Sequence, residues 1–254
     1  MAGRLDGRVA LVTGAASGIG RATALAFAQH GANVVVSDVA VAGGKETVER
    51  IQASGGEATF VRADVSVAED AANLVQSAVE AYGGLDCANN SAGIEGAGFA
   101  PHEYPEDLWD RVMAINLKGV WLCLKYEVEQ MLRQGGGAIV NTASVSGLIG
   151  VPNASGYVAA KHGVVGLTKS AGLAYATKGI RVNAVCPGFV RTPMLEALMA
   201  ERGPEYEAIV VAAEPVGRLG SPEEVAEFVV WLCTDAASFV TGAALPVDGG
   251  YVAR

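Results

Sequence analysis

Positively charged residues are scarce in this 254-residue sequence. There are 18 Lys and Arg against 27 Asp and Glu, which gives a formal net charge of −9. Nucleic-acid binding requires clustered Lys and Arg to neutralise phosphates, so this balance argues against such a partner. A cofactor that carries phosphate remains compatible with it, because backbone N–H groups can bind phosphate without basic side chains. No apolar run of the sequence approaches the roughly 20 residues that span a bilayer, so we expect no membrane partner.

Cysteine and histidine are also rare. The cysteines form no C-x-x-C pair and lie in apolar stretches, so we expect small buried side chains rather than metal ligands or disulfides. They are Cys87, Cys123, Cys186 and Cys233. The histidines have no evident partners, and no G-x-S-x-G hydrolase motif occurs. The sequence therefore predicts neither a metal site nor a hydrolase of that type.

Apolar and small residues are abundant. Hydrophobic residues make up 51% of the sequence and charged residues 18%, which is typical of a well-buried globular protein. A chain of this length forms one large α/β domain or two small ones. An apolar strand is expected as early as residues 9–12, which leaves no room for a signal peptide, and we therefore expect a cytoplasmic protein.

Short β-branched runs alternate with longer helical stretches along the sequence. Strands are expected at residues 9–12, 34–36, 58–61, 85–89, 138–142, 181–185 and 244–247. Helices are expected at residues 18–30, 44–53, 68–82, 155–177 and 222–233, with a long amphipathic stretch at 105–132. Apolar strands separated by helices predict a doubly wound α/β fold, with a parallel sheet covered on both faces, in one domain over residues 1–254. Residues 189–219 exceed an ordinary connection, and we expect them to cover an active site.

A glycine-rich turn follows the first expected strand. Gly14, Gly18 and Gly20 have the spacing G-x-x-x-G-x-G, which differs from the usual G-x-G-x-x-G dinucleotide fingerprint. Glycines in either spacing permit a tight turn, close approach of the backbone to a pyrophosphate, and close packing of helix on strand. A helix that begins near Gly18 directs its free N–H groups at phosphates. Such turns also occur in unrelated proteins, but the position between the first strand and the first helix favours a dinucleotide cofactor.

Asp38 closes the second expected strand, where a carboxylate can bind the adenosine ribose hydroxyls. A carboxylate at this place repels a 2′-phosphate, and the next residue, Val39, carries no compensating charge. The alternative is that Asp38 only caps the turn that follows. We predict NAD rather than NADP.

Tyr157 and Lys161 lie four residues apart on an expected helix, so their side chains share one face. An unperturbed tyrosine has a pKa of roughly 10, too high for a base near neutrality. A nearby ammonium group lowers that pKa. Tyr157 is therefore a candidate acid/base, although the same spacing occurs by chance in many helices.

Further motifs accompany this pair in order: the glycine-rich turn, Asn90-Ser91-Ala92-Gly93, Asn116, Ser144 and Pro187-Gly188. Together they resemble the short-chain dehydrogenase/reductase family, from about residue 5 to residue 250. The resemblance implies a Rossmann-type seven-stranded sheet, a homotetramer, and hydride transfer between NAD and a hydroxyl or carbonyl group of a small molecule. The family often has a second Asn where Ser91 stands; we expect this departure to affect the packing of the fourth strand and to leave the catalytic set intact.

The resemblance also implies catalytic roles. Tyr157 is implied as proton donor and acceptor, and Ser144 as the residue that hydrogen-bonds the substrate oxygen. Lys161 is implied to bind the nicotinamide ribose and to lower the pKa of Tyr157, and Asn116 to hold a water that links Lys161 to solvent. Taken singly, Ser144 could be a turn residue, Lys161 a solvated charge and Asn116 a helix irregularity. Their occurrence together favours the catalytic interpretation.

Other positions are implied as cofactor contacts. Asp64 and Val65 resemble an adenine-binding pair, and Ile19 offers a backbone N–H to the pyrophosphate. The positions implied beneath the adenosine ribose are Asn90, Ala92 and Gly93. The full predicted cofactor set is Gly14, Ser17, Gly18, Ile19, Gly20, Asp38, Asp64, Val65, Asn90, Ala92, Gly93, Tyr157, Lys161, Pro187, Gly188, Val190 and Thr192.

The substrate is less well defined. Residues 189–219 carry an apolar series, which either lines the pocket or packs helices: Met194, Leu195, Leu198, Met199, Ile209, Val210 and Val211. If the series lines the site, a neutral hydrophobic alcohol fits better than a carboxylate, an acyl-CoA or a carrier protein. Residues 141–147 and 193–195 resemble bacterial cyclic-alcohol and cyclic-diol dehydrogenases of the family.

Two alternative functions are compatible with parts of this motif set. A 3-oxoacyl-carrier-protein reductase shares these motifs, but such enzymes typically use NADPH, and Asp38 argues against that cofactor. A non-catalytic dinucleotide sensor has no need of the four catalytic residues. By the same resemblance, the subunit interface is expected on residues 105–132, on residues 155–177 and on the C-terminal segment that ends at Arg254.

Overall fold

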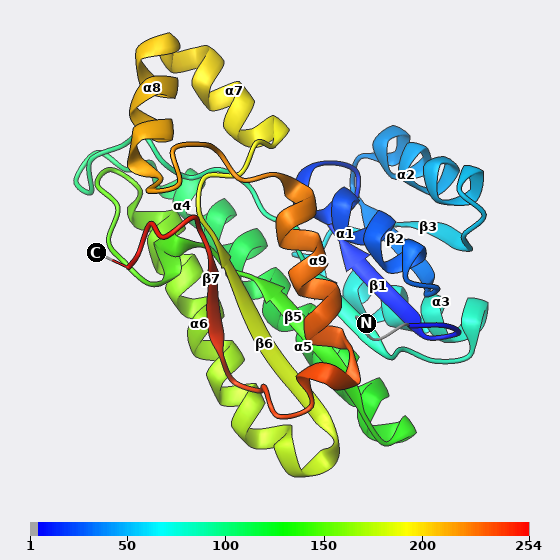
Figure 1. Ribbon diagram of the computed structural model, residues 1–254. Helices are drawn as coiled ribbons and strands as arrows, with labels where there is room; N and C mark the ends of the chain where they lie inside the picture. Colours follow the sequence, from blue (N-terminus) through cyan, green and yellow to red (C-terminus); the bar gives the residue numbers. More distant parts are fainter. Residues whose placement is uncertain (1–4, 254) are drawn as a thin grey trace.

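The computed structural model describes residues 5–253, and Arg254 of the expected interface lies outside them. Its centre is a sheet of seven parallel strands in the order β3-β2-β1-β4-β5-β6-β7 (Figure 1). The strands are β1 (Val9–Thr13), β2 (Asn33–Asp38), β3 (Ala58–Arg62), β4 (Cys87–Asn90), β5 (Gly137–Thr142), β6 (Ile180–Pro187) and β7 (Ala244–Val247). This order confirms the predicted Rossmann-type α/β fold with a seven-stranded parallel sheet.

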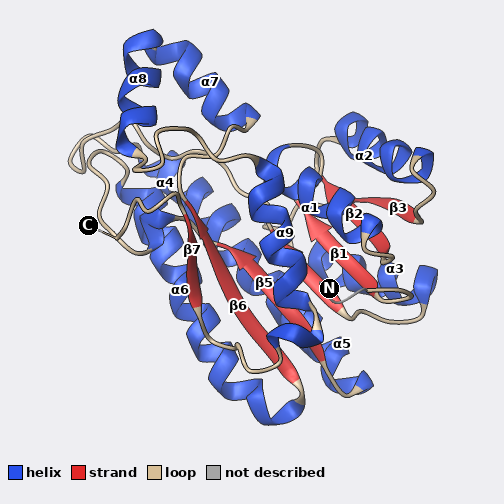
Figure 2. Cartoon of the chain, in the orientation of Figure 1, coloured by secondary structure: helices blue, strands red, loops and turns tan. Residues whose placement is uncertain are grey.

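Helices cover both faces of the sheet (Figure 2). On one face lie α1 (Gly18–Gln29), α2 (Val41–Ala53) and α9 (Pro222–Cys233). On the other lie α3 (Ala68–Tyr82), α5 (Val120–Gln134) and α6 (Ser155–Tyr175). Short 3₁₀ turns occupy Val145–Gly147, Ala176–Lys178 and Asp235–Ala237. None of the helices within residues 5–253 combines the length and the apolar character that crossing a membrane requires.

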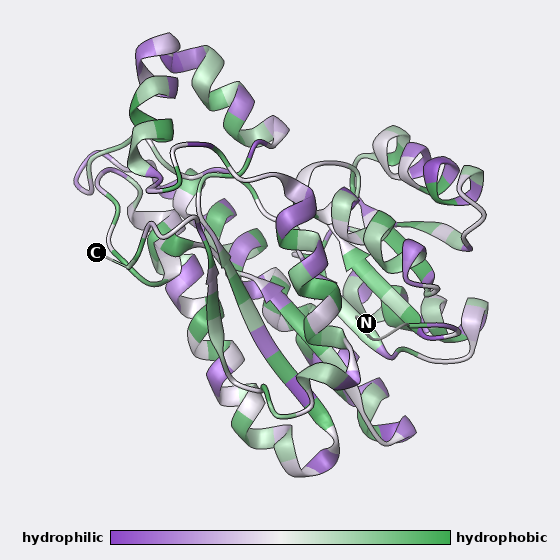
Figure 3. Ribbon diagram, in the orientation of Figure 1, coloured by the Kyte–Doolittle hydropathy of each residue, from purple (hydrophilic) through white to green (hydrophobic). Residues whose placement is uncertain are grey.

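Alternating side chains of each strand build two separate cores. On β1, Ala10 and Val12 pack in the cluster that contains Phe27 of α1. Val9 and Leu11 point the other way, into the cluster that contains Leu74 of α3. Successive strand residues face opposite sides of a sheet, so a strand covered on both faces must be apolar throughout. Figure 3 shows this as strands coloured mostly green.

The amphipathic stretch predicted at residues 105–132 is a helix with an irregular centre. It consists of α4 (Glu106–Met113), a π-helical turn (Ala114–Gly119) and α5. Asn116 lies in the π turn and is fully buried. Such turns insert one residue into a helix and occur frequently at functional sites.

The long segment at residues 189–219 is mostly helical. It contains α7 (Pro193–Arg202) and α8 (Pro204–Ala213), which project beyond the carboxyl ends of the strands (yellow and orange in Figure 1). The Thr192 hydroxyl caps α7 by accepting a hydrogen bond from the Leu195 N–H, and Pro193 fits the first turn because it needs no N–H partner there. The Phe189 N–H donates to Glu214 Oε1 at 2.6 Å, which fastens the two ends of the segment together.

Candidate active site

A cavity of about 1490 Å³ lies at the carboxyl ends of the strands. One part of its wall is the glycine-rich turn with Asp38, and another is Ser144, Tyr157 and Lys161. In open α/β sheets this edge is where ligands bind, and the volume exceeds what a small substrate alone needs. Predicted cofactor residues on the wall are Gly14, Ser17, Gly18, Ile19, Gly20, Asp38, Asp64, Val65, Ala92, Gly93, Tyr157, Lys161, Pro187, Gly188, Val190 and Thr192.

The glycine-rich turn is tight enough to require glycine at two positions. Gly14 has φ +67°, and a Cβ there would lie 2.7 Å from the Cα of Ala92. A Cβ on Gly20 would lie 2.2 Å from the carbonyl oxygen of Gly14. The Ser17 side chain makes no capping hydrogen bond at the start of α1. The first backbone N–H groups of this helix, which lie at the cavity wall, therefore have no side-chain acceptor from Ser17. The turn therefore suits an anionic pyrophosphate.

Asp38 holds the turn in place as well as facing the cavity. Its Oδ2 accepts the Ala16 N–H at 3.0 Å and its Oδ1 accepts the Ala40 N–H at 2.9 Å. Asp38 therefore does cap the turn that follows β2, as the alternative interpretation proposed. The cap leaves lone pairs on both oxygens for ribose hydroxyls. Arg62, opposite Asp38 in the sheet register, lies 4.0 Å from the carboxylate of Asp70.

Asp64 is similarly fixed near the expected adenine position. Its Oδ1 accepts hydrogen bonds from both the N–H and the hydroxyl of Ser66, at 2.9 and 2.7 Å. These bonds favour the carboxylate and lower the pKa of Asp64. The side chain therefore carries its charge throughout the physiological pH range.

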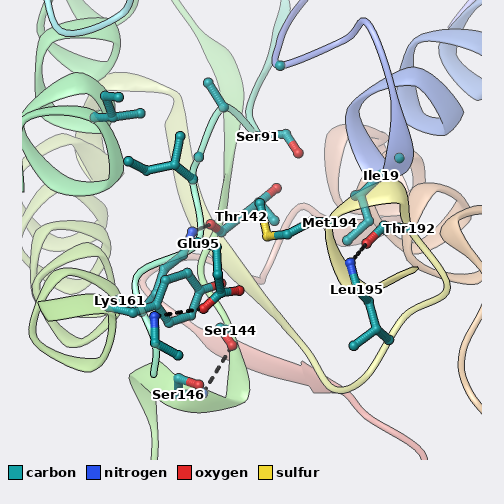
Figure 4. A pocket seen from close by; sticks show the side chains of 18 of the residues that line it. Ile19, Ser91, Glu95, Thr142, Ser144, Ser146, Lys161, Thr192, Met194 and Leu195 are labelled. Atoms are coloured by element: carbon teal, nitrogen blue, oxygen red, sulfur yellow. Dashed lines mark hydrogen bonds between the residues drawn. The ribbon is translucent and has the colours of Figure 1, made fainter. Parts of the chain in front are cut away.

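Helix α6 carries Tyr157 and Lys161 to the inner wall of the cavity. It packs closely on the 3₁₀ turn after β5, where a Cβ on Gly147 would lie 2.7 Å from the Lys161 carbonyl oxygen. This contact brings Ser144, at the start of the turn, to the same wall. Lys161 Nζ donates to the Thr142 carbonyl at 2.8 Å and lies 5.6 Å from the centroid of the Tyr157 ring. Ser144 Oγ accepts the Ser146 N–H at 3.1 Å (Figure 4).

The pKa of Tyr157 differs from the sequence prediction. Lys161 was expected to lower this pKa, whereas the protein without cofactor raises it to about 12. Burial of the phenol is the largest cause, the Glu95 carboxylate adds to it, and a hydrogen bond with Ser144 acts in the opposite direction. Burial also lowers the pKa of Lys161 to about 8. Burial and the nearby carboxylate therefore outweigh the hydrogen bond with Ser144 at this phenol.

Asn90 and Asn116 lie behind the cavity wall. The Asn90 amide donates to Glu127 Oε2 and to Asn141 Oδ1, both at 3.0 Å, so its side chain points into the protein. A contact of Asn90 with the ribose remains a prediction. The Asn116 amide exchanges two hydrogen bonds with the backbone of Ile94, at 2.8 and 2.9 Å. Asn116 thereby positions the loop after β4, and its predicted water-holding role remains a prediction.

Glu95 is among the cavity residues that the sequence does not predict. Glu95 lies on the loop after β4 and points into the cavity on the side of Ser144 (Figure 4). The available signal was its position: an acid within the apolar run that follows the fourth strand, at the edge where ligands bind. The apolar residues of 189–219 serve both purposes that were weighed. Met194, Leu195 and Leu198 line the cavity, and Leu195 also packs with Met199 and Val210 in a cluster of its own.

Comparison with known proteins assigns the family. The profile described as Enoyl-(Acyl carrier protein) reductase matches residues 14–252. The cyclohexanol dehydrogenase of Acinetobacter sp. (strain SE19) is 48% identical over 254 residues, covering 100% of this chain and 98% of that protein. The chain is a short-chain dehydrogenase/reductase. It is accordingly an oxidoreductase, and the motifs quoted above are those of its family.

Other relatives of this short-chain dehydrogenase/reductase act on substituted rings. The 2,5-dichloro-2,5-cyclohexadiene-1,4-diol dehydrogenase of Sphingobium indicum (strain DSM 16412 / CCM 7286 / MTCC 6364 / B90A) is 46% identical over 98% of both chains. The cis-4-hydroxycyclohexanecarboxylate dehydrogenase of Sinomonas cyclohexanicum is 47% identical over 97% of both.

Solved structures of the family superpose closely. Levodione reductase matches with a TM-score of 0.93 and 40% identity, over 99% of this chain and 100% of that one. A variant of the actinorhodin polyketide ketoreductase with NADPH matches with a TM-score of 0.92 and 41% identity, over 96% and 97% of the two chains. A nicotinamide dinucleotide is therefore the cofactor of the family, and it is the phosphorylated form in this relative.

Proposed function

We propose that this protein is an NAD-dependent dehydrogenase that interconverts a neutral cyclic secondary alcohol and its ketone. The observation that carries the proposal is the shared cavity wall of Ser144, Tyr157 and Lys161, in a cavity that extends to the glycine-rich turn and Asp38. In this proposal the whole chain works as one catalytic domain.

The side chains divide the chemistry among them. A bound nicotinamide supplies the hydride acceptor or donor. Tyr157 gives a proton to the substrate oxygen during reduction and removes it during oxidation. The Ser144 hydroxyl donates to the same oxygen and stabilises its developing charge. Lys161 lies on the same wall, held by Thr142, where its ammonium can bind ribose hydroxyls and favours the phenolate form of Tyr157 once both are in contact with the cofactor.

Asp38 supports NAD over NADP. Its carboxylate accepts two backbone N–H groups and is thereby fixed at the cavity wall, where a 2′-phosphate would meet like charge. A structural relative contains NADPH, so the preference of this chain for NAD rests on Asp38 and needs a direct test. We therefore expect Asp38→Ala to lower the preference for NAD⁺ over NADP⁺, measured as the ratio of kcat/KM, by about tenfold or more.

Cyclic alcohols are supported by two independent observations. The lid side of the cavity carries Met194, Leu195 and Leu198, which favour an apolar ring. The curated relatives at 46–48% identity are named for cyclohexanol, a cyclohexadiene diol and a hydroxycyclohexane carboxylate. A six-membered carbocycle with a secondary hydroxyl group is their shared feature.

The test is reduction of NAD⁺, followed by absorbance, with a panel of cyclic and acyclic secondary alcohols. We expect turnover of cyclohexanol-type substrates with NAD⁺, and a loss of about 10²-fold or more in kcat for Tyr157→Phe with NADH binding retained. Tight NADH binding with no turnover of any cyclic alcohol would refute the substrate class. Full activity of Tyr157→Phe would refute the assigned acid/base.

We further propose a cytoplasmic homotetramer. Large apolar side chains are exposed on the elements expected at the interface: Trp121 on α5, Leu173 on α6, and Phe239 before β7. Exposed large apolar side chains of this kind favour association. The four cysteines are free and buried, as is usual in a reducing compartment.

A further inference from the structure

Glu95 is an acid in the part of the cavity where the substrate ring must lie. It lines the same cavity as Ser144 and Tyr157, and its charge reaches the Tyr157 phenol strongly enough to raise the pKa of that group. Figure 4 shows it pointing into the cavity, with Ser144 on one side and Met194 across from it. The proton-transfer mechanism above makes no use of this carboxylate.

The carboxylate is held by its own loop. Glu95 Oε1 accepts the N–H groups of Gly96 and Ala97, at 3.0 and 2.9 Å. Among residues 5–253, no hydrogen bond to the other oxygen, Oε2, is found. Tyr104, which donates to the Gly96 carbonyl at 2.8 Å, fixes the same loop from behind. Glu95 therefore presents one anchored oxygen and one oxygen with free lone pairs.

A carboxylate in this position requires a hydrogen-bond donor. The lid side of the cavity begins with the apolar side chains of Met194, Leu195 and Leu198. A substrate ring that packs against them displaces water from Glu95. An unsubstituted ring then leaves a carboxylate oxygen without a partner, which is unfavourable, and a ring carboxylate meets like charge. A second hydroxyl on the ring donates to Oε2 and removes the penalty.

Resting on the proposed function, we propose that Glu95 recognises a second hydroxyl group on the substrate ring, so that cyclic diols are the preferred substrate class. Tyr157 and Ser144 act on one oxygen of the ring, and Glu95 binds the other. Glu95 is in this view a specificity-determining residue that takes no part in the transfer of the proton.

Two arginine side chains, Arg202 and Arg111, also line the cavity. Arg202 lies at the end of α7 with its guanidinium 4.9 Å from the Tyr206 ring centroid, next to Glu201 in sequence. Arg111 lines the cavity from α4. Neither forms an ion pair with Glu95 among the interactions of residues 5–253. A carboxylate substrate bound near Arg202 is the competing outcome, and the experiment includes it.

The experiment compares kcat/KM for cyclohexanol, for the cis and trans isomers of 1,2-, 1,3- and 1,4-cyclohexanediol, and for cis-4-hydroxycyclohexanecarboxylate, at saturating NAD⁺ and one pH. Variants are Glu95→Leu, Glu95→Gln, and Glu103→Gln as a matched control, since Glu103 is an exposed acid just beyond the same loop. A change in the pKa of Tyr157 affects kcat/KM for a diol and for cyclohexanol equally, because both substrates use the same phenol. The ratio of the two kcat/KM values is therefore independent of that pKa.

We expect the wild type to prefer at least one diol over cyclohexanol by about tenfold or more. Glu95→Leu should abolish that preference, Glu95→Gln should keep part of it because its amide oxygen still accepts a hydrogen bond, and Glu103→Gln should retain it. An unchanged ratio in Glu95→Leu, or a preference for the carboxylate over every diol, would overturn the inference.

Calorimetric titration of the enzyme–NADH complex with the same diols separates this inference from the proposed function. Diol binding that weakens about tenfold in Glu95→Leu, without turnover of any substrate, supports recognition by Glu95 and refutes the dehydrogenase activity. Turnover of cyclohexanol without measurable binding or turnover of any diol leaves the dehydrogenase activity standing and refutes the role of Glu95.

Discussion

Two ionisable side chains, the half-buried Tyr157 and the fully buried Glu127, show how strongly a pKa depends on the surroundings. Tyr157 and Glu127 are ordinary acids in the sequence, yet burial raises the pKa of the phenol to about 12 and that of the carboxyl to about 7. In each case removal of the charged form from water is the largest cause. The consequences differ, because one group faces the cavity and the other is enclosed by the protein.

At Tyr157 the raised pKa predicts opposite pH profiles for the two directions of the reaction. Below the pKa the phenolate fraction rises about tenfold per pH unit, so kcat/KM for alcohol oxidation should rise from pH 7 towards alkaline pH, whereas ketone reduction uses the neutral phenol. Glu95→Gln removes a charge that raises this pKa, so its oxidation profile should shift to lower pH. Initial rates in both directions test this, with Glu103→Gln as control; a profile that is unmoved in Glu95→Gln contradicts it.

At Glu127 the raised pKa predicts a pH-dependent stability. The folded protein binds more protons than the unfolded chain between about pH 4.5 and pH 7, so this group's contribution to stability is lost as the pH rises through that window. Above pH 7 the buried carboxylate destabilises the fold by up to about 3 kcal/mol. Glu127→Gln should therefore raise the free energy of unfolding at pH 8, and this gain should vanish near pH 4.5.

The matched control for that measurement is Glu129→Gln. Glu129 is exposed on the same helix and pairs with Arg133, so its removal should change stability by less than about 1 kcal/mol at any pH. Urea unfolding at pH 5, 6.5 and 8 measures both variants. If the two variants change the free energy of unfolding equally at every pH, Glu127 is solvated in the folded protein, contrary to its complete burial.

At the scale of single elements, some features of the helices can be predicted from the sequence and others cannot. Helix α9 begins with a capping box, in which Ser221 and Glu224 each bond the other's backbone N–H, and Pro222 occupies the first turn. Such signals are local and could be predicted. A helix irregularity at Asn116 was open only as an alternative, because the two hydrogen bonds that Asn116 makes with Ile94, 22 residues earlier, leave no local signal.

The turn before α1 yields a prediction at this scale. Gly20→Ala places a methyl group 2.2 Å from the Gly14 carbonyl oxygen, so the backbone must move and the phosphate-facing N–H groups with it. We expect NADH affinity to fall at least about tenfold by fluorescence titration. Gly166→Ala on α6, with open space around the new methyl group, is the control and should bind NADH normally. Unchanged binding in Gly20→Ala would remove the turn from the cofactor site.

At the scale of the whole molecule, exposed apolar groups predict assembly. Phe239 is fully exposed and Leu173 of α6 is 83% exposed, which is unfavourable for a solitary subunit. We expect light scattering to give a tetramer, and Leu173→Glu combined with Phe239→Asp to give smaller species with unchanged far-UV circular dichroism. Lys178→Glu, a charge change on a residue that is already polar, serves as control. A wild-type monomer at micromolar concentration would contradict the tetramer.

The sequence by itself determined the alternation of strands and helices, the glycine-rich turn, and the candidate catalytic set of Ser144, Tyr157 and Lys161. These follow from periodicity, from backbone requirements and from motifs in a fixed order, all of which are local. Only the tertiary structure decided that Asn90 turns inward to Glu127 and Asn141, that burial raises the pKa of Tyr157, and that Glu95 enters the cavity. Direction, burial and electrostatic environment arise from residues distant in sequence, and they exist only once the chain has packed.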